Sequence, residues 1–372
     1  MSPPSLYVHV PFCHSECTYC DFYRVSYRDD AADAFLGALA KELATLPRDW
    51  VPPTIYVGGG TPSALREEQL ESLLEALAPF RSPGQEYTFE VNPKSANKQK
   101  IDLLAQAGVN RVSFGAQTFD APLLKLLGRR HGPDDIRRVY GMLREKVRSI
   151  SFDLIFALPT ELIELWERDL EAAIHLSPDH LSVYSLIHEP NTPLTLSIER
   201  GERSAQPEEV EREMYLLAID RLGDAGYEHY EVSSFARAGH RSAHNQAYWR
   251  QDDYYGVGPG ATSTIGLRRY SNRRDLRGYV QGIERVGIPP REEERLGLDE
   301  RIREHLMMRL RTSGGLSLSI FESLSGTSLS RYSNGAFERL AALGLLQVSG
   351  DIIRLTREGL CVADRVIVEL MA

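Results

Sequence analysis

Three cysteines near the N-terminus are the residues of this sequence with the clearest chemistry. Cys13, Cys17 and Cys20 form a C-x3-C-x2-C pattern, and the fourth cysteine, Cys361, lies far away near the C-terminus. If four cysteines were scattered at random, this pattern would arise in roughly one chain of this length in two thousand. Thiolates are soft ligands that select zinc, Cu(I) or iron–sulfur clusters. The spacing therefore indicates a metal centre rather than a disulfide framework.

Three interpretations of this cysteine loop are open. A [4Fe–4S] cluster on three cysteines leaves one iron free, and that iron can bind the amino and carboxylate groups of S-adenosylmethionine (SAM). A structural zinc ion needs a fourth protein ligand, which His14 or His9 can supply. Core packing of the thiols on one helix face fits poorly, because Pro11 comes shortly before them and polar residues lie between them. Ligand softness and spacing favour the iron–sulfur cluster.

The elements that must position such a centre follow from the hydrophobic pattern. Strands and amphipathic helices that alternate along the chain indicate βαβ units and a parallel sheet. Six units predict an α/β fold, a partial (β/α)6 TIM-like barrel rather than the full eightfold form. The expected strands are 6–11, 54–58, 87–92, 111–115, 150–157 and 180–186, and the helices are 33–46, 67–77, 98–107, 135–145, 162–175 and 208–222.

Reactive residue types follow the expected strands. In barrels of this kind the active site gathers at the carboxyl ends of the strands. The cysteine loop follows the first strand, a Gly-Gly-Gly-Thr turn at 58–61 ends the second, Glu90 lies near the end of the third, and Gln117 follows the fourth. Asp153 lies early in the fifth strand. We therefore expect most of these residues to meet at one site, where glycines let the backbone approach a ligand closely.

The rest of the chain has a different sequence pattern from the first 235 residues. We expect residues 1–235 to form the core barrel, 236–292 an irregular, aromatic-rich extension, and 293–372 a C-terminal domain. In this last part, helices precede a hairpin around Ser349-Gly350-Asp351, which predicts a winged-helix-like domain. Its acidic and basic residues are nearly equal in number, which favours a structural or protein-binding module over a DNA-binding one.

The overall composition excludes several classes of protein. The net charge is -9, so a large nucleic-acid footprint is not expected. No apolar run reaches the length of a membrane span. The N-terminus lacks the charged and apolar regions of a secretory signal and the Arg- and Ser-rich composition of a transit peptide. We therefore expect a cytoplasmic protein.

The segment LYVHVPFCHSECTYCDFY resembles the cysteine loop of the radical SAM superfamily, in the coproporphyrinogen-oxidase-like branch that contains HemN oxidases and HemW haem chaperones. The resemblance continues in order along the whole chain. Its further motifs are GGGTPS (58–63), EVNP (90–93), RVSFGAQTF (111–119), LGRRH (127–131), FDLIFALP (152–159), HLSVYSL (180–186), YEVSSFA (230–236), HNQAYW (244–249), GVGPGATS (256–263) and RYSNRRDL (269–276).

The resemblance implies a ligand set for the barrel. The three loop cysteines would hold a [4Fe–4S] cluster, the glycines and Thr61 would meet the methionine end of SAM, and Glu90 would accept hydrogen bonds from an ammonium or a ribose. For Asp153 or Arg129 alone, a buried ion pair is the alternative. The implied SAM contacts are Tyr7, Tyr19, Gly59, Gly60, Thr61, Glu90, Gln117, Arg129, Asp153 and Ile187.

Two departures separate the two members of this branch. HemN-type oxidases carry a fourth cysteine where this chain has Phe22, and they carry an N-terminal extension, whereas the first strand here begins at residue 5 or 6. HNQAYW resembles the HemW haem-binding motif. A neutral His244 imidazole is a good axial ligand for haem iron, and Tyr248 and Trp249 can stack on the porphyrin. The alternative is a surface histidine beside two half-buried aromatic rings.

These features favour a HemW-like haem chaperone that carries a [4Fe–4S] cluster and SAM. It would transfer haem to acceptor proteins, respiratory enzymes at the membrane. The alternative is a radical SAM enzyme acting on a tetrapyrrole, an oxygen-independent coproporphyrinogen III oxidase. The sequence does not decide whether SAM is cleaved or whether the protein forms a homodimer. Thr262 replaces the usual histidine of GPGAHS, 160–162 depart from the usual LPGQT, and Cys361 is expected to be inert core.

Overall fold

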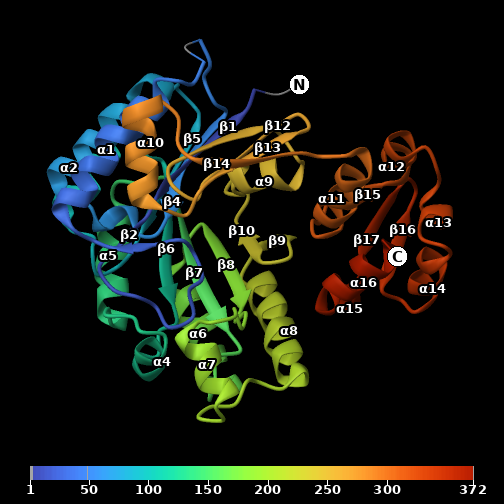
Figure 1. The fold of residues 1–372 in the computed structure, drawn as a ribbon. Helices are drawn as coiled ribbons and strands as arrows, with labels where there is room; N and C mark the ends of the chain where they lie inside the picture. The colour runs from blue at the N-terminus through green and yellow to red at the C-terminus, as the bar shows by residue number, and fades with distance from the viewer. Residues whose placement is uncertain (1–2, 48, 372) are drawn as a thin grey trace.

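The computed structural model describes residues 3–47 and 49–371. Figure 1 shows two parts, a large one built on a twisted sheet and a smaller, mainly helical one at the C-terminal end of the chain. None of the helices in these two ranges combines the length and the apolar character that a membrane span requires.

Six parallel strands form the centre of the large part. Each pairs with the next along the chain, and helices connect them, as expected for a partial (β/α)6 barrel. In sheet order they are β1 (Ser5–Val10), β4 (Thr54–Gly59), β5 (Glu86–Val91), β6 (Arg111–Gln117), β7 (Ser149–Phe156) and β8 (His180–Ser185). The α/β prediction is confirmed.

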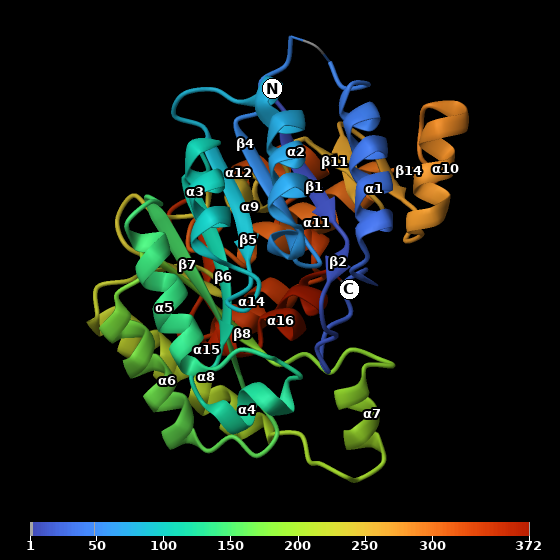
Figure 2. The ribbon, with the colours of Figure 1, turned by 90° about the vertical axis from the view of Figure 1, so that its left-hand side faces the viewer.

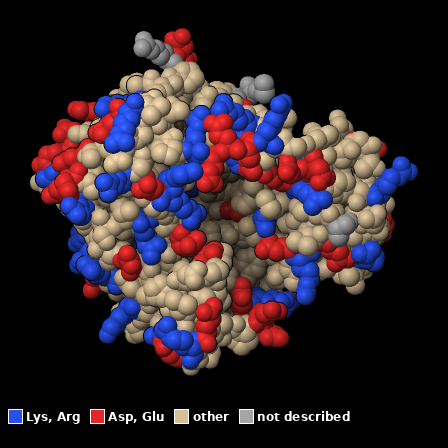
Figure 3. All heavy atoms as spheres, in the orientation of Figure 1, with Lys and Arg blue, Asp and Glu red and all other residues tan. Residues whose placement is uncertain are grey.

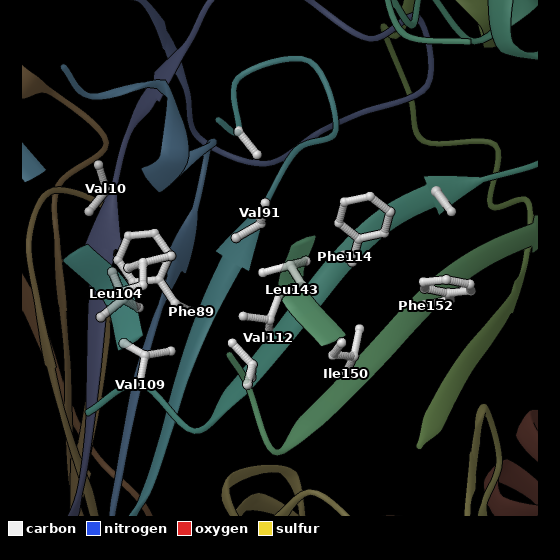
Figure 4. Close-up of a cluster of buried hydrophobic side chains, with 14 of the residues drawn as sticks. Val10, Phe89, Val91, Leu104, Val109, Val112, Phe114, Leu143, Ile150 and Phe152 are labelled. Atoms are coloured by element: carbon white, nitrogen blue, oxygen red, sulfur yellow. The ribbon is translucent and has the colours of Figure 1, made fainter. Parts of the chain in front are cut away.

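Helices cover one face of this sheet, in front of the strands in Figure 2. Strand residues alternate between the two faces, so the buried Val112 and Phe114 of β6 pack toward the helices while Ser113 faces the barrel interior. Figure 4 shows Phe114 and Phe152 in this apolar layer. The covering helices are α1 (Asp29–Leu43), α2 (Glu67–Leu77), α3 (Lys98–Gln106), α5 (Pro133–Arg144), α6 (Ile163–Leu176) and α8 (Glu208–Asp224), whereas α4 (Ala121–Leu126) belongs to a separate apolar cluster.

The segment 236–292 is not irregular, so the sequence expectation was wrong in this respect. Strands β11 to β14 extend the sheet beyond β1, where β11 pairs with β1 in parallel. On the opposite edge, β10 and β9 from the end of the preceding segment extend it beyond β8, to a total of twelve strands. Short strands gain stability from their neighbours rather than from intrinsic propensity, which is why the local pattern did not reveal them. The added elements are β9 (Glu228–Glu231), β10 (Ser234–Ala236), α9 (Ala243–Trp249), β11 (Tyr254–Val257), β12 (Thr262–Ile265), β13 (Arg268–Asn272), α10 (Leu276–Val286) and β14 (Arg291–Arg295).

The C-terminal part has its own hydrophobic core and a three-stranded sheet in the order β15-β17-β16. The expected hairpin is present, and helices precede it as expected. Two of these helices, α13 and α14, are separated where the chain turns through Gly335 with a φ of 80°. The elements are α11 (Leu298–Leu310), β15 (Leu316–Ser317), α12 (Leu318–Ser325), α13 (Leu329–Tyr332), α14 (Ala336–Ala342), β16 (Leu346–Ser349), β17 (Ile352–Leu355), α15 (Arg357–Cys361) and α16 (Ala363–Leu370).

Candidate functional site

A cavity of about 940 Å³ occupies the interior of the partial barrel. This volume lies at the upper end of the range for small-molecule sites. The face of the molecule in Figure 3 is hollowed near its middle, and charged side chains of both signs surround the hollow. The cavity extends from the cysteine loop to α9.

The cysteine loop is closed at its base by two short parallel strands, β2 (Phe12–Cys13) and β3 (Val25–Ser26). The backbone amide of Thr18 donates to the carbonyl oxygen of Leu127 at 3.1 Å, and its hydroxyl donates to the carbonyl oxygen of Leu126 at 2.9 Å. The loop is thereby fixed to the segment that follows α4. Strand β1 therefore delivers the three thiols to the edge of the cavity.

The three loop cysteines are free and half-buried, and all of them line the cavity. The Cys13 Sγ lies 3.4 Å from the Thr61 hydroxyl, and the Arg129 Nη1 donates to the Cys17 Sγ at 3.5 Å. Burial raises the pKa of the Cys13 thiol to about 11, so metal binding would have to displace its proton. In residues 3–47 and 49–371, no three His, Cys, Asp or Glu side chains converge as ligands of one metal ion. Three separate thiols beside a large cavity fit an iron–sulfur cluster.

The glycine turn after β4 packs against the cysteine loop. Gly59 has a φ of +111°, and a Cβ there would lie 2.7 Å from the His9 ring. A Cβ on Gly60 would lie 2.8 Å from the carbonyl carbon of Pro11. The turn therefore needs glycine for packing within the protein as well as for exposing its backbone to the cavity.

Two half-buried carboxylates face the cavity. Glu90 accepts the Tyr56 hydroxyl at 2.8 Å and the Gly59 amide at 3.2 Å. Burial, followed by the charge of Asp153, raises the pKa of Glu90 to about 7. Asp153 accepts the Ser113 hydroxyl at 3.0 Å, and burial raises its pKa to about 6. The pair can bind cationic or hydroxyl groups of a ligand.

Arg129 places a buried guanidinium beside the cysteine loop. Its Nη2 donates to the Gly115 carbonyl oxygen at 2.7 Å, and its Nε finds no partner among the described residues. The bonds that it forms go to a carbonyl and a thiol rather than to a carboxylate. Nearby, β6 ends at Gln117 with a φ of 70°, and the Gln117 side chain lines the cavity.

Helix α9 closes the opposite end of the cavity. The Glu86 carboxylate accepts the backbone amides of Ala243 and His244 at 2.9 and 2.8 Å. The Ser242 hydroxyl caps the helix by accepting the Asn245 amide. These bonds attach the beginning of α9 to the beginning of β5.

His244 is enclosed rather than exposed. The His244 residue is only 1% exposed, and burial lowers the pKa of its imidazole to about 3. Its Nδ1 lies 2.7 Å from the Thr54 hydroxyl, and its Nε2 lies 3.0 Å from the Tyr248 hydroxyl. Both ring nitrogens are therefore engaged, and the alternative of a surface histidine does not apply.

Thr262, which replaces the histidine expected at this position of the family motif, lies in β12, and its hydroxyl forms a hydrogen bond with the Ser271 hydroxyl.

The structure brings almost all of the expected site residues together. The three loop cysteines, the ten expected SAM contacts, His244 and Tyr248 line one cavity, but Trp249 is not part of its lining. Sequence reasoning missed Tyr56 and Tyr184, which also line it. Tyr56 had a signal, because it pairs in register with Tyr7 on the neighbouring parallel strand.

Comparison with known proteins places this geometry in a family. The profile described as Radical SAM superfamily matches residues 7–173, and the HemN C-terminal domain matches residues 296–362. Heme chaperone HemW of Bacillus subtilis (strain 168) is 36% identical over 369 residues, with 97% of each chain covered. The chain belongs to the HemW family of radical SAM proteins.

Two further relatives show how widely this chain's architecture occurs. Radical S-adenosyl methionine domain-containing protein 1, mitochondrial, of Mus musculus is 34% identical, covering 99% of this chain and 87% of its own length. The structure of coproporphyrinogen III oxidase (HemN) from Escherichia coli, a radical SAM enzyme, matches with a TM-score of 0.87 and 26% identity, covering 100% of this chain and 90% of that one. Radical SAM membership implies a [4Fe–4S] cluster and SAM, and the thiols and the cavity described above fit both.

Proposed function

We propose that this chain is a haem chaperone of the HemW type. It holds a [4Fe–4S] cluster on Cys13, Cys17 and Cys20, holds SAM in the adjoining cavity, and passes haem to acceptor proteins. The observation that supports this most strongly is similarity over the full length to heme chaperone HemW of B. subtilis. Phe22, at the position of the fourth cysteine of the oxidase pattern, is 71% exposed at the cavity.

Different residues of the cavity bind different parts of SAM in this proposal. A bound cluster supplies an open iron for the amino and carboxylate groups of SAM. The Gly59–Thr61 turn contacts the methionine end, and Glu90 accepts from the ammonium or the ribose. The Ile187 backbone contacts the adenine. Tyr7, Tyr19, Gln117, Arg129 and Asp153 complete the wall.

The cluster also has support from the protein around it. Arg129 donates to the Cys17 Sγ, which places a positive charge beside one of the proposed cluster ligands. The loop itself is fixed by the backbone bond between Thr18 and Leu127. The chain therefore supplies both the ligands and a charge that stabilises them.

Haem contacts are proposed at the HNQAYW segment, through His244, Tyr248 and Trp249. In the geometry described above, the His244 Nε2 bonds the Tyr248 hydroxyl. Ligation of haem iron by this nitrogen therefore requires the Tyr248 hydroxyl to release it. We propose that this release accompanies haem binding.

The second candidate is a radical SAM reaction on a tetrapyrrole, which the structural match to HemN favours. The two functions separate in one experiment. The cluster is reconstituted without oxygen, and the protein is offered haem or, separately, coproporphyrinogen III with SAM and a reductant. A chaperone gives a haem spectrum and no new porphyrinogen. Formation of protoporphyrinogen IX would contradict the chaperone proposal, and a His244→Ala variant with undiminished haem binding would contradict the ligand assignment.

The cellular setting of this function is part of the proposal. We propose action in the cytoplasm, with respiratory enzymes at the membrane as acceptors. The division into a barrel (1–235), an extension (236–292) and a C-terminal domain (293–372) stays a proposal, as does a homodimer. Haem-loaded protein mixed with respiratory membranes should lose haem to them, as followed by absorbance after sedimentation. Retention of all haem by the protein would contradict delivery to membrane acceptors.

A further inference from the structure

Helix α9 is joined to β4 by two side-chain contacts. The His244 Nδ1 bonds the Thr54 hydroxyl. Its ring stacks on Tyr56, with ring centroids 5.0 Å apart and an interplanar angle of 30°. Thr54 and Tyr56 are two residues apart, so both point to the interior face of the strand. His244 is therefore packed against the strand that leads to the glycine turn.

Tyr56 is in turn joined to the proposed SAM pocket. Its hydroxyl donates to one oxygen of Glu90 at 2.8 Å, and the other oxygen of Glu90 accepts the Gly59 amide at 3.2 Å. The Glu90 carboxylate thus bridges the tyrosine and the turn. A continuous series of contacts runs from His244 through Tyr56 and Glu90 to Gly59.

We propose that His244 and Tyr56 are positioning residues for the SAM pocket. The His244 ring holds Tyr56 in place, and the Tyr56 hydroxyl holds Glu90 toward the ligand. The HNQAYW segment therefore influences SAM affinity before any haem is bound. This inference rests on the proposed function, from which it takes SAM as the ligand near Glu90.

The charge state of Glu90 explains why its hydrogen bond to Tyr56 matters. The groups that face Glu90 are the Tyr56 hydroxyl, the Gly59 amide, Asp153 and Tyr7. The first two favour the ionised carboxylate, and Asp153 opposes it. Without the Tyr56 bond, the pKa of Glu90 would rise further, and more of the population would be neutral. A neutral carboxyl binds the ammonium or ribose groups of SAM more weakly.

The test uses the reconstituted full-length protein without haem, with SAM affinity measured by calorimetry. Tyr56→Phe keeps the ring and loses the hydroxyl, so SAM affinity should fall by roughly ten- to a hundredfold, as for a lost hydrogen bond to a charged group. His244→Ala removes the stack and should weaken SAM binding by roughly three- to tenfold. His244→Phe restores a stacking ring without nitrogens, so it should recover SAM affinity while it abolishes haem ligation.

Tyr87→Phe is the matched control. Tyr87 is a buried tyrosine of β5 whose hydroxyl has no hydrogen-bond partner among the residues that the structure describes, and it does not line the cavity. Its loss should leave SAM affinity unchanged. The pH profile gives a readout that loss of structure alone would not move. In Tyr56→Phe the midpoint of SAM binding on the acid side should shift to higher pH, because the pKa of Glu90 rises.

The outcomes separate this inference from the proposed function. Wild-type SAM affinity in His244→Ala, or failure of His244→Phe to recover it, overturns the inference while the chaperone proposal stands. Unchanged affinity and pH midpoint in Tyr56→Phe also overturn it, and this variant decides the matter if the His244 variants do not fold. A wild-type protein that binds no SAM overturns the proposed function itself and this inference with it.

Discussion

The three loop cysteines differ from Cys361 in their surroundings more than in their burial. All four are half-buried thiols, but only the loop cysteines face the cavity, whereas the Cys361 Sγ donates to the Arg357 carbonyl oxygen within its own helix. We predict that Cys13→Ser, Cys17→Ser or Cys20→Ser abolishes iron–sulfur absorbance after reconstitution. Cys361→Ser is the control and should load iron normally. Full iron content in all of the loop variants would contradict the cluster assignment.

Glu161 is a buried carboxyl outside the cavity. It is 2% exposed, and one oxygen accepts the Leu158 amide at 2.9 Å. Burial raises its pKa from 4.5 to about 8. A carboxyl with a raised pKa costs nothing below its unfolded-state pKa, and its cost grows as the pH rises toward the folded-state value.

We therefore predict that Glu161→Gln stabilises the protein at high pH. The gain in the free energy of unfolding should be on the order of 2–4 kcal/mol at pH 8 and near zero at pH 4.5. Thermal unfolding of both proteins across this pH range measures the difference. An equal gain at both pH values would show that ionisation of Glu161 is not the cause.

At the level of elements, the glycine turn at the end of β4 packs against the segment that leads into the cysteine loop. We predict that Gly59→Ala destabilises the protein by about 1–3 kcal/mol, because a side chain at this φ is strained and would collide with the His9 ring. It should also impair cluster loading, since the turn packs on the cysteine loop. Unfolding in denaturant and iron content are the measurements.

Gly84 provides the control for this substitution. It also has a positive φ, of 80°, but a Cβ there meets nothing within 4 Å. Gly84→Ala should therefore show backbone strain alone, with normal iron content. Equal loss of iron in both variants would mean that general destabilisation, rather than the packing of the turn, is responsible.

At the scale of the whole molecule, the C-terminal part contacts the barrel through α8 and α15. Arg357 bonds both oxygens of Asp220 at 2.6 and 2.7 Å, and Arg212 pairs with Glu358 at 2.6 Å. All four side chains are exposed, so each pair contributes little. Backbone bonds add to the junction, among them the Ser313 amide to the Tyr230 carbonyl oxygen.

We predict that Arg357→Ala lowers the free energy of unfolding by less than about 1 kcal/mol and that added salt masks the effect. Asp220→Ala should have the same effect, and the double variant should lose no more than either single one. Chemical unfolding at low and high salt provides the data. A loss of several kcal/mol would show that the ion pair controls domain docking.

Most of the barrel could be predicted from the sequence, because each βα unit repeats a local hydrophobic period. The segment 236–292 could not, since its strands are short and β11 forms by pairing with β1, some 250 residues earlier. Similarly, Glu90 and Asp153 were expected at one site. That the charge of Asp153 raises the pKa of Glu90 depends on the tertiary structure, which brings the two strands together.

The sequence by itself determined the α/β class, and it predicted the chemistry of the cysteine loop and most of the residues that line one cavity. Spacing and hydrophobic periodicity are local properties that are sufficient for the class, and the resemblance to a known family supplied most of the site residues. Only the tertiary structure decided the surroundings of His244, which the sequence presents as a free imidazole. Its enclosure by Thr54, Tyr56 and Tyr248 arises from packing between a helix and a strand that are about 190 residues apart, and no local pattern records such a contact.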